Sequence, residues 1–493
     1  MRIRLSVVVL SLLQAIAPTR AQTLNDPALD QFIEKTLHTW SVPGAVVVVV
    51  QGDRVLYLKG FGVRSLDDRQ PVTPDTLFPL ASCTKAFTAT AVALLVDEGK
   101  MHWDDPVRKH LGWFRLSDPL ADANVTLRDL LTHRTGLGPH EPLWYHAPWG
   151  PEEAVRRAGR LPLSHSFRST FQYQSTMYTA AGLAVAAAAG TSWRDFVQQR
   201  LVAPLDMNGV AFTTDEAEKA EWARPHRNDP EGKVVPTAGY RMRYPEPAGS
   251  LHASGRHLAN WLRFQLGDGT FAGRRLLSAA ALAETHTPQM VMRLDDLTKA
   301  MNPHTHQMSY GLGWVIQDHR GQLVISHLGA IDGYRAQLTL LPQTRFGIGI
   351  LANLHATRMN LALTNILIDL LLGLPSQDWN TYYADLSRKL DRQLRERDRQ
   401  LEERRQRGKP ASSPWAAYVG SYVNPAYGTA TVRLERQQLV WEWNQFRCPL
   451  RHLDGDAFTL ADEHLGKQEL VFRLGADKNV WGFRLFSVDF EKQ

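Results

Sequence analysis

The sequence predicts an α+β domain built on an antiparallel sheet, followed by a small all-β domain. Two strand-like runs, residues 45–50 and 54–60, lie near the start of the chain, and a third, residues 347–351, lies far along it. Helical segments flank these runs at both ends. This arrangement is typical of a sheet covered by a first and a last helix, with a mostly helical lobe inserted between them. After about residue 414, short alternating runs favour a barrel-like β domain.

The bulk composition agrees with more than one folded domain. A chain of 493 residues exceeds one ordinary core, and a hydrophobic content of 44% with 14 Trp is typical of globular proteins. The formal net charge is +6, and the charged segment at residues 384–407 carries much of the basic excess. Nucleic-acid binding needs a basic face and a reading motif, so no nucleic-acid partner is expected.

Residues 1–21 are predicted to be a secretory signal peptide. Arg2 and Arg4 precede an apolar run, residues 5–17, and Pro18-Thr-Arg-Ala21 supplies a small-residue cleavage site. A buried N-terminal helix is the alternative. The apolar run is shorter than the roughly 20 residues that span a bilayer, so no integral membrane segment is expected after cleavage. We therefore expect an exported protein, periplasmic or secreted.

The first folded domain is predicted to cover residues 22–375. Gly52-Asp53 turns one early strand into the next, and a second apolar helix ends at Gly99. Loops rich in Pro, Gly and His are expected over about residues 102–170. The predicted elements are helix 27–40, strands 45–50 and 54–60, helix 86–96, strands 322–326 and 347–351, and helix 360–372.

A charged helical linker, residues 376–413, is predicted to join the two domains. Residues 384–407 are highly charged with interspersed leucines but lack a sustained a/d seam, so a solvated helix is favoured over a coiled coil. Gly408-Lys-Pro-Ala-Ser-Ser-Pro414 breaks the helix. The C-terminal β domain then covers residues 414–493. Its alternating runs are residues 429–435, 439–443, 457–460, 469–473 and 480–486.

Cys83 and Cys448 are the two cysteines of the chain, and they fall in different predicted domains. A disulfide between them would pull the second domain onto the turn that contains Ser82. Buried, unreactive thiols are therefore the favoured interpretation for both residues.

Ser82 and Lys85 form the most informative pair in the chain. They lie in Phe78-Pro-Leu-Ala-Ser-Cys-Thr-Lys85, at the start of an apolar helical segment. Residues at i and i+3 share one face of a helix, so a hydroxyl and an amine are held side by side. A serine hydroxyl alone is a poor nucleophile at neutral pH, but an amine of lowered pKa can take its proton. The pair predicts nucleophilic catalysis by serine.

Two further motifs, Tyr173-Gln-Ser175 and His327-Leu-Gly329, complete a pattern. Ser-x-x-Lys, Tyr-x-Asn/Ser and Lys/His-x-Gly, in this order, resemble the active site of serine β-lactamases and penicillin-binding protein-like hydrolases, on the class C and D-aminopeptidase branch. The resemblance covers roughly residues 28–375 and implies a β-lactamase/transpeptidase-like fold. Tyr418-Val-Gly-Ser-Tyr422, in the tail, resembles a small β domain found behind such hydrolases.

The resemblance also implies a role for each motif residue. Ser82 is the nucleophile, and Lys85 and Tyr173 transfer protons. Which of these two is the general base stays open, and the pair is treated as one titrating unit. Backbone N–H groups of Ser82 and Ala330 would form the oxyanion hole. Gly329 would let the strand edge approach the acyl group closely.

Two of the motif positions depart from the class C pattern. Ser175 stands where Asn is usual, and a hydroxyl is shorter and offers one donor where an amide offers two, so recognition of a substrate amide should be weaker. His327 replaces the commoner Lys and is expected to be mostly neutral at pH 7. It would therefore offer no fixed charge to a β-lactam carboxylate, and strong β-lactamase activity is not expected.

The sequence thus predicts a serine hydrolase that cleaves an amide or peptide bond, D-residue-containing substrates included, through an acyl-Ser82 intermediate. Its partner would be a small molecule or a peptide, and no cofactor or metal is expected because the three motifs supply every required role. An esterase or weak β-lactamase using the same site, and a non-catalytic penicillin-binding-like protein, remain the alternatives. The sequence does not specify an oligomeric state.

Overall fold

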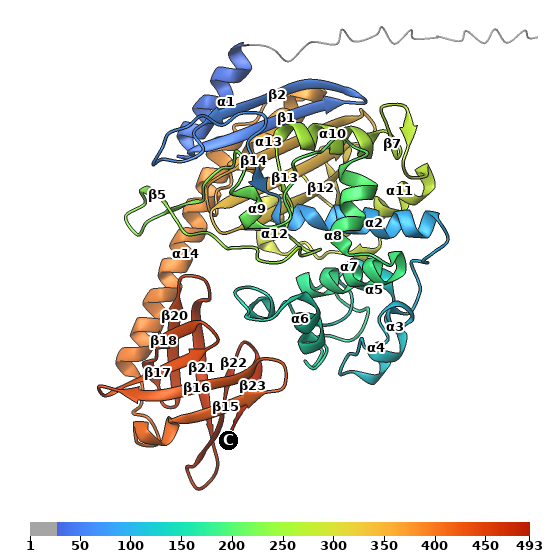
Figure 1. Cartoon of the computed structure of the whole chain (residues 1–493). Helices are drawn as coiled ribbons and strands as arrows, with labels where there is room; N and C mark the ends of the chain where they lie inside the picture. Colours follow the sequence, from blue (N-terminus) through green and yellow to red (C-terminus); the bar gives the residue numbers. More distant parts are fainter. Residues whose placement is uncertain (1–26) are drawn as a thin grey trace, which may run out of the picture.

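The computed structural model describes residues 27–493 (Figure 1). The predicted signal peptide, residues 1–21, lies outside the described residues. An α+β domain, a long helix and a β domain follow one another along the chain, which is the predicted fold class. In the part of the chain that is described, none of the helices has the length and apolar character needed to cross a bilayer.

An eight-stranded antiparallel sheet forms the centre of the first domain. Strands from the two ends of the domain lie side by side in it, because β1 pairs with β14 along its whole length. In spatial order the strands are β2 (Arg54–Gly62), β1 (Gly44–Gln51), β14 (Phe346–Ala352), β13 (Tyr334–Leu341), β12 (Gln322–Ile331), β11 (Val315–His319), β10 (Met308–Tyr310) and β9 (Met290–Val291).

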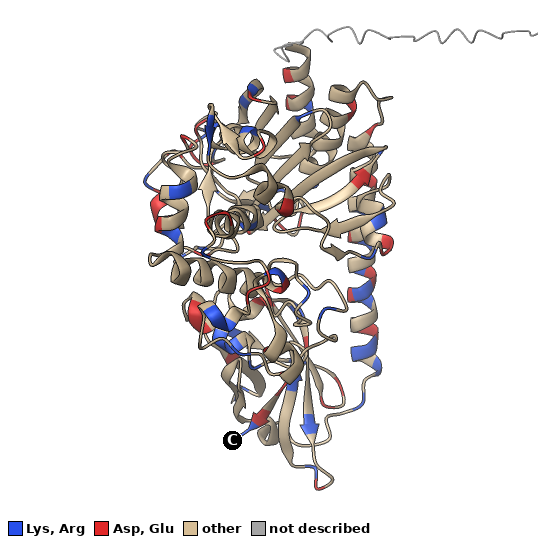
Figure 2. Cartoon of the chain, turned by 90° about the vertical axis from the view of Figure 1, so that its right-hand side faces the viewer, with Lys and Arg blue, Asp and Glu red and all other residues tan. Residues whose placement is uncertain are grey.

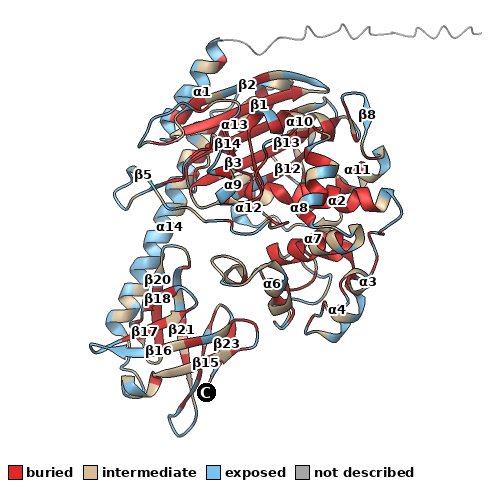
Figure 3. Ribbon diagram, in the orientation of Figure 1, coloured by how far each residue is buried: buried red, intermediate tan, exposed pale blue. Residues whose placement is uncertain are grey.

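Helices cover both faces of this sheet, which explains the unbroken valine run of β1. Successive side chains of a strand point to opposite faces. Val47 packs in one cluster with Ile33, whereas Val46 belongs to a second cluster with Leu262. Both faces are therefore buried (Figure 3). The first face carries α1 (Pro27–Thr39) and α13 (Met359–Leu372), and the second carries α2 (Thr84–Asp97) and α10 (Gly255–Leu266).

A helical lobe lies between α2 and α10 in the sequence. The range expected to be loops contains short helices, and local capping explains some of them. The Asp118 carboxylate accepts a hydrogen bond from the backbone N–H of Ala121, and Thr126 and Asp129 form a capping box. The lobe helices are α3 (Val107–His110), α4 (Pro119–Asn124), α5 (Leu127–Leu131), α6 (Pro151–Ala158), α7 (Ser175–Ala189), α8 (Trp193–Val197) and α9 (Thr214–Ala217).

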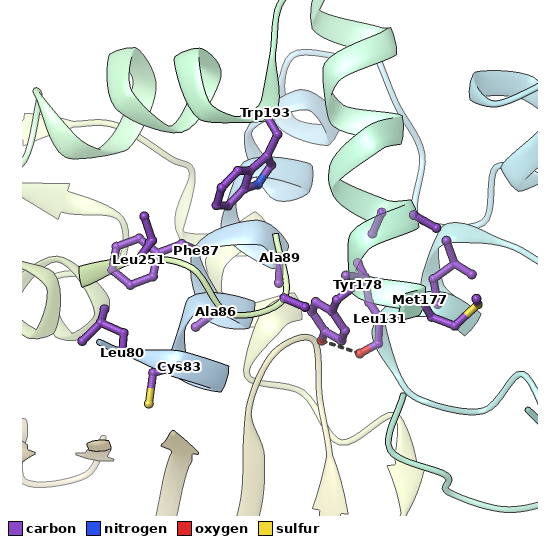
Figure 4. Packing of buried hydrophobic residues seen from close by; sticks show 14 of the residues in the cluster. Leu80, Cys83, Ala86, Phe87, Ala89, Leu131, Met177, Tyr178, Trp193 and Leu251 are labelled. Carbon is purple, nitrogen blue, oxygen red and sulfur yellow. Dashed lines mark hydrogen bonds between the residues drawn. The ribbon is translucent and has the colours of Figure 1, made fainter. Parts of the chain in front are cut away.

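The lobe packs directly on α2, and this packing buries α2 on every side. Twelve of the fourteen α2 residues are buried, so the helix shows no polar face. The next layer is α7, which is tied to the end of α5 by a hydrogen bond of 2.6 Å from the Tyr178 hydroxyl to the Leu131 carbonyl (Figure 4). Segments that are far apart along the chain therefore pack together around the start of α2.

The predicted linker contains one long helix, α14 (Trp379–Arg407). Its first turns pack on α13, where Trp379 and Tyr383 are buried and the Trp379 Nε1–H donates to the Asp369 carboxylate over 2.7 Å. The later turns are exposed and carry charges of both signs (Figure 2). The helix is thus anchored in the first domain and solvated only along its later part.

The C-terminal domain is a nine-stranded antiparallel sheet that nearly closes into a barrel. Trp441 and Trp443 are fully buried in its core, as their alternation with Glu442 suggests. Cys448 is also buried here, and both cysteines are free thiols, as expected. In spatial order the strands are β18 (Phe446–Pro449), β17 (Gln438–Trp443), β16 (Gly428–Glu435), β15 (Gly420–Asn424), β23 (Val488–Lys492), β22 (Val480–Leu485), β21 (Gly466–Leu474), β20 (Ala457–Asp462) and β19 (Arg451–Asp454).

The anchoring of α14 gives a stability prediction. Trp379→Ala should lower the free energy of unfolding of the first domain by about 3–5 kcal/mol, because it empties a buried site and removes a partner of Asp369. Urea unfolding followed by circular dichroism measures the change. Leu394→Ala on the same helix is the control, because Leu394 is 60% exposed and its loss should cost less than about 0.5 kcal/mol. Equal effects from the two substitutions would mean that the helix start is not anchored.

Candidate active site

Ser82 lies in a single 3₁₀ turn, η1 (Ala81–Cys83), that leads into α2. Ala81 has a φ of +45°, in the left-handed region that a residue with a side chain rarely adopts. Contacts on both sides hold the turn. The Leu80 N–H donates to the Leu251 carbonyl over 2.7 Å, and the Cys83 thiol donates to the His327 carbonyl over 3.3 Å. Ser82 is therefore held between β12 and the segment that precedes α10.

Lys85 is fully buried on the first turn of α2. Its Nζ lies 3.2 Å from Ser82 Oγ and donates to the Ala248 carbonyl over 2.9 Å. Burial lowers the pKa of Lys85 to about 7, although attraction to Glu141 and Glu246 acts in the opposite direction. A substantial neutral fraction is therefore present near pH 7, and this amine is in place to accept the serine proton.

Tyr173 stands over the same lysine. Lys85 Nζ lies 4.7 Å from the centre of the Tyr173 ring, and the buried Tyr173 hydroxyl has no hydrogen-bond partner among the described residues. Burial raises the pKa of Tyr173 well above its ordinary value, while the neighbouring Ser82 hydroxyl works the other way. The phenol is therefore protonated at neutral pH, which suits a proton donor better than a base.

His133 positions the segment that carries Tyr173. Its Nδ1 accepts a 3.0 Å hydrogen bond from the backbone N–H of Gln174, and its ring lies 4.4 Å from that of Tyr173. The Gln174 side chain caps α7, which begins at Ser175. The fold thus places Tyr173 and Ser175 on either side of a helix start, beside Ser82.

The third motif, His327-Leu-Gly329, lies inside a strand and not after its end. The sequence predicts a strand that stops at Ser326, but β12 continues to Ile331. The neighbouring strand β11 pairs with β12 only as far as Ser326, whereas β13 pairs with it to Ile331. One edge of the backbone over residues 327–331 is therefore not paired with another strand. Such a free edge suits an oxyanion hole or the binding of an extended substrate.

Gly329 allows this free edge to lie against the nucleophile turn. A Cβ atom at position 329 would lie 2.1 Å from the Leu80 carbonyl oxygen. That separation is too short for any side chain, so a larger residue would force the backbone to move. The next residue, Ala330, borders both cavities that open at Ser82. The structure therefore brings the residues expected to form the oxyanion hole to one place.

His327 is buried and neutral. Its Nδ1 lies 2.7 Å from the Leu328 carbonyl, which only accepts, so Nδ1 carries the proton and Nε2 accepts a 3.0 Å hydrogen bond from the Tyr310 hydroxyl. Burial, together with the charge of Lys85, lowers the pKa of His327 to about 3. Both ring nitrogens are occupied, so His327 supplies no positive charge to a substrate.

Ser82 lies between two cavities. The first is lined by Ser175 and mainly apolar or aromatic groups together with one carboxylate; its residues include Trp144, Thr179, Tyr240, Met242 and Glu246. The second opens past the free edge of β12 and is rich in methionine; its residues include Tyr173, Met292, Met301, Met308, Tyr310 and His327. A substrate can therefore extend on both sides of the reacting carbonyl.

Sequence reasoning missed two acids near the lysine, Glu141 and Glu246. Burial raises the pKa of each to about 7, and the charge of Lys85 lowers it. No described residue donates a hydrogen bond to the Glu246 carboxylate. Glu141 begins a short 3₁₀ turn and Glu246 lies in a lobe loop, and neither has a motif spacing to Ser82. The one available signal was the position of Glu246 directly before Pro247-Ala-Gly249, a segment within the family resemblance.

An antiparallel sheet with a serine–lysine pair at its junction with a helical lobe is the arrangement of the β-lactamase fold. The chain belongs to the β-lactamase family, whose family model matches residues 29–372. Residues 404–493 match a second family model, described as a domain of unknown function (DUF3471). Family members are serine hydrolases, and amidases and esterases occur among them.

Individual relatives agree with this assignment. The chain is 28% identical to "Unguisins hydrolase ungD'" of Aspergillus campestris, over 85% of this chain and 80% of that protein. A solved octameric penicillin-binding protein homologue from Pyrococcus abyssi superposes with a TM-score of 0.62 and 22% identity, covering 94% of this chain and 99% of that one. A D-amino acid amidase from Ochrobactrum anthropi superposes with a TM-score of 0.56 and 23% identity, covering 73% of this chain and 99% of that one. The two solved structures share the fold.

The close approach at Gly329 can be tested directly. Gly329→Ala should slow acylation of Ser82 about 100-fold, because β12 must move away from the nucleophile turn and a displacement of about 1 Å is enough for such a loss. The burst rate with a nitrophenyl ester measures it. Gly112→Ala is the control, since a Cβ there meets nothing within 4 Å. A wild-type burst rate in Gly329→Ala would show that the edge does not need this contact.

The pKa of Lys85 predicts the pH dependence of acylation. A lysine that acts as the base must be neutral, so the rate should rise with pH through about 7 and then level off. The negative charge of Glu246 raises the pKa of Lys85, so Glu246→Gln should move the rise to lower pH. Single-turnover rates between pH 5 and 9 test both statements. A rise that begins only above about pH 9 would indicate an ordinary, solvated lysine.

Proposed function

We propose that this protein hydrolyses amide or peptide bonds, including those of D-residue-containing substrates, through an acyl-Ser82 intermediate. The observation that carries the proposal is the 3.2 Å separation of Ser82 Oγ from the buried Lys85 Nζ, at the point where two cavities meet. A hydroxyl beside a partly neutral amine is an activated nucleophile.

In the proposed reaction, Ser82 Oγ attacks the carbonyl carbon and its proton passes to Lys85. Backbone N–H groups of Ser82 and Ala330 stabilise the oxyanion. As the tetrahedral intermediate collapses, the carbon–nitrogen bond breaks and the Tyr173 hydroxyl gives its proton to the leaving nitrogen. Lys85 then returns a proton to Tyr173. Water repeats the sequence on the acyl-enzyme and releases the acid.

The first cavity supports a substrate that carries an amine near the scissile bond. Glu246 presents a carboxylate that no described side chain pairs by a hydrogen bond, and Trp144 and Tyr240 line the same cavity. A substrate ammonium would bind the carboxylate and the aromatic faces together. The name of one structural relative, a D-amino acid amidase, supports an amide as the bond cleaved.

Ester hydrolysis is the second candidate. Ser175 offers a single hydroxyl where an amide side chain would recognise a substrate amide, and most of the first cavity is apolar. A weak β-lactamase is disfavoured by the neutral, fully hydrogen-bonded His327. A non-catalytic binding protein would acylate Ser82 without releasing product.

Intact-mass spectrometry tests the proposal. The protein is exposed to D-aminoacyl amides, their N-acetyl analogues, short esters and penicillins. We expect acylation and turnover with the free-amine amides, and Ser82→Ala should lose about 10³-fold or more. Glu246→Gln should weaken the free-amine substrates selectively. Turnover of esters alone would favour the esterase, acylation without turnover would favour the binding protein, and wild-type activity in Ser82→Ala would refute the acyl-serine mechanism.

We also propose that the protein is exported. Support comes from the order of charges, apolar run and small residues over residues 1–21. The purified protein from its native host should begin at Gln22, as N-terminal sequencing would show. A chain that keeps Met1 and fractionates with the cytosol would contradict export.

A further inference from the structure

One β-turn of the C-terminal domain lies near the mouth of the first cavity. The turn at residues 463–465 joins β20 to β21, at the end of the domain that faces the first domain (Figure 1). There the Tyr145 hydroxyl donates to the Asp332 carboxylate and lies 3.2 Å from His464 Nδ1. Three segments that are distant in sequence therefore meet: a lobe loop, the turn after β12 and the β20–β21 turn.

Three metal-ligand side chains gather at this meeting point. One ligand atom from each of His146, Asp332 and His464 lies within 4.8 Å of the others. His464 Nδ1 is 3.5 Å from Asp332 Oδ2, close to the roughly 3.4 Å that separates two ligands of a tetrahedral ion bound at about 2.1 Å. All three side chains are partly exposed, so small rotations complete the geometry.

A buried nitrogen in this cluster lacks a partner. His146 Nε2 is buried and makes no hydrogen bond to any described residue, although its ring lies 4.2 Å from that of His464. Burying such a group unsatisfied is unfavourable. A cation between the rings would satisfy this nitrogen.

An outer shell orients His464 as a ligand. Glu463 Oε1 lies 3.3 Å from His464 Nε2, and Arg227 Nη1 holds the other Glu463 oxygen at 2.6 Å. A carboxylate beside Nε2 favours the tautomer in which Nε2 carries the proton and donates toward Glu463, which leaves the Nδ1 lone pair on the side of Asp332 and Tyr145. Carboxylates on the second ring nitrogen are a regular feature of histidine–metal sites.

We propose that His146, Asp332 and His464 bind a zinc ion that fastens the C-terminal domain over the mouth of the active-site cavity. Two imidazoles and one carboxylate match the ligand preference of zinc, with water in the fourth position. Calcium and magnesium prefer all-oxygen sites, which this cluster does not offer.

The ion would act on access to the site and not on the bond-breaking steps. Asp332 follows Ile331, which lines the first cavity, and His146 lies two residues after Trp144, which lines it as well. Zinc would thus fix two walls of the cavity to the second domain. Removing it should loosen the entrance while Ser82, Lys85 and Tyr173 keep their places.

The test uses the tag-free full chain, stripped by a chelator and titrated with Zn²⁺ against a chromophoric competitor. We expect one tight zinc per chain, and at least tenfold weaker binding in His464→Gln and in His146→Gln. Glu463→Gln should weaken binding by about 10–100-fold. His306→Gln is the control, since His306 is 86% exposed and pairs with Asp318 elsewhere, and it should bind like the wild type.

Two further readouts keep the result decisive. Zinc should raise the melting temperature of the wild type by a few degrees but not that of His464→Gln, whose folding is checked by circular dichroism. Co²⁺ in the wild type should give the intense visible bands of a four- or five-coordinate nitrogen–oxygen site. Absence of stoichiometric binding, or equal affinity in the wild type and both histidine variants, would overturn the proposal.

Discussion

The burial of Lys85 beside Ser82 is the constraint on which the rest of the structure depends. An ammonium group removed from water is costly unless it is paired, and here it has a carbonyl, a hydroxyl and two acids that form no hydrogen bond with it. The cost is relieved by loss of the proton, which is the property a base needs. Keeping Lys85 dry requires α2 to be covered on all sides, by the sheet below and the lobe above.

The second constraint is the free edge of β12. An antiparallel sheet normally pairs both sides of an inner strand, yet β11 begins only at Val315, opposite Ser326, and leaves residues 327–331 paired on one side. Such an edge is an aggregation hazard when it is exposed. Here the nucleophile turn lies against it, with Gly329 beneath the Leu80 carbonyl. The same unpaired backbone that would be a liability elsewhere is the edge that we propose receives the substrate.

The C-terminal β domain also helps to form the entrance of the site, because it contacts the lobe at several points. Besides the β20–β21 turn, the Tyr427 hydroxyl lies 3.0 Å from His140, and Arg157 donates to the Ala426 carbonyl over 3.0 Å. His140 directly precedes Glu141, one of the acids that act on Lys85. Docking of the β domain therefore bears on both the shape and the electrostatics of the cavity.

The sequence by itself determined the fold class, the two domains and the Ser82–Lys85 pair, because strand alternation, helix spacing and an i, i+3 motif are local properties. The short lobe helices were not predicted, because they depend on capping side chains and not on hydrophobic periodicity. The full length of β12 was not predicted either, because residues beyond Ser326 are held in the strand by pairing with β13. The acids around Lys85 and the cluster of His146, Asp332 and His464 were decided by tertiary structure alone. Those residues come from loops far apart in the chain, and only the packing of lobe, sheet and barrel sets their distances.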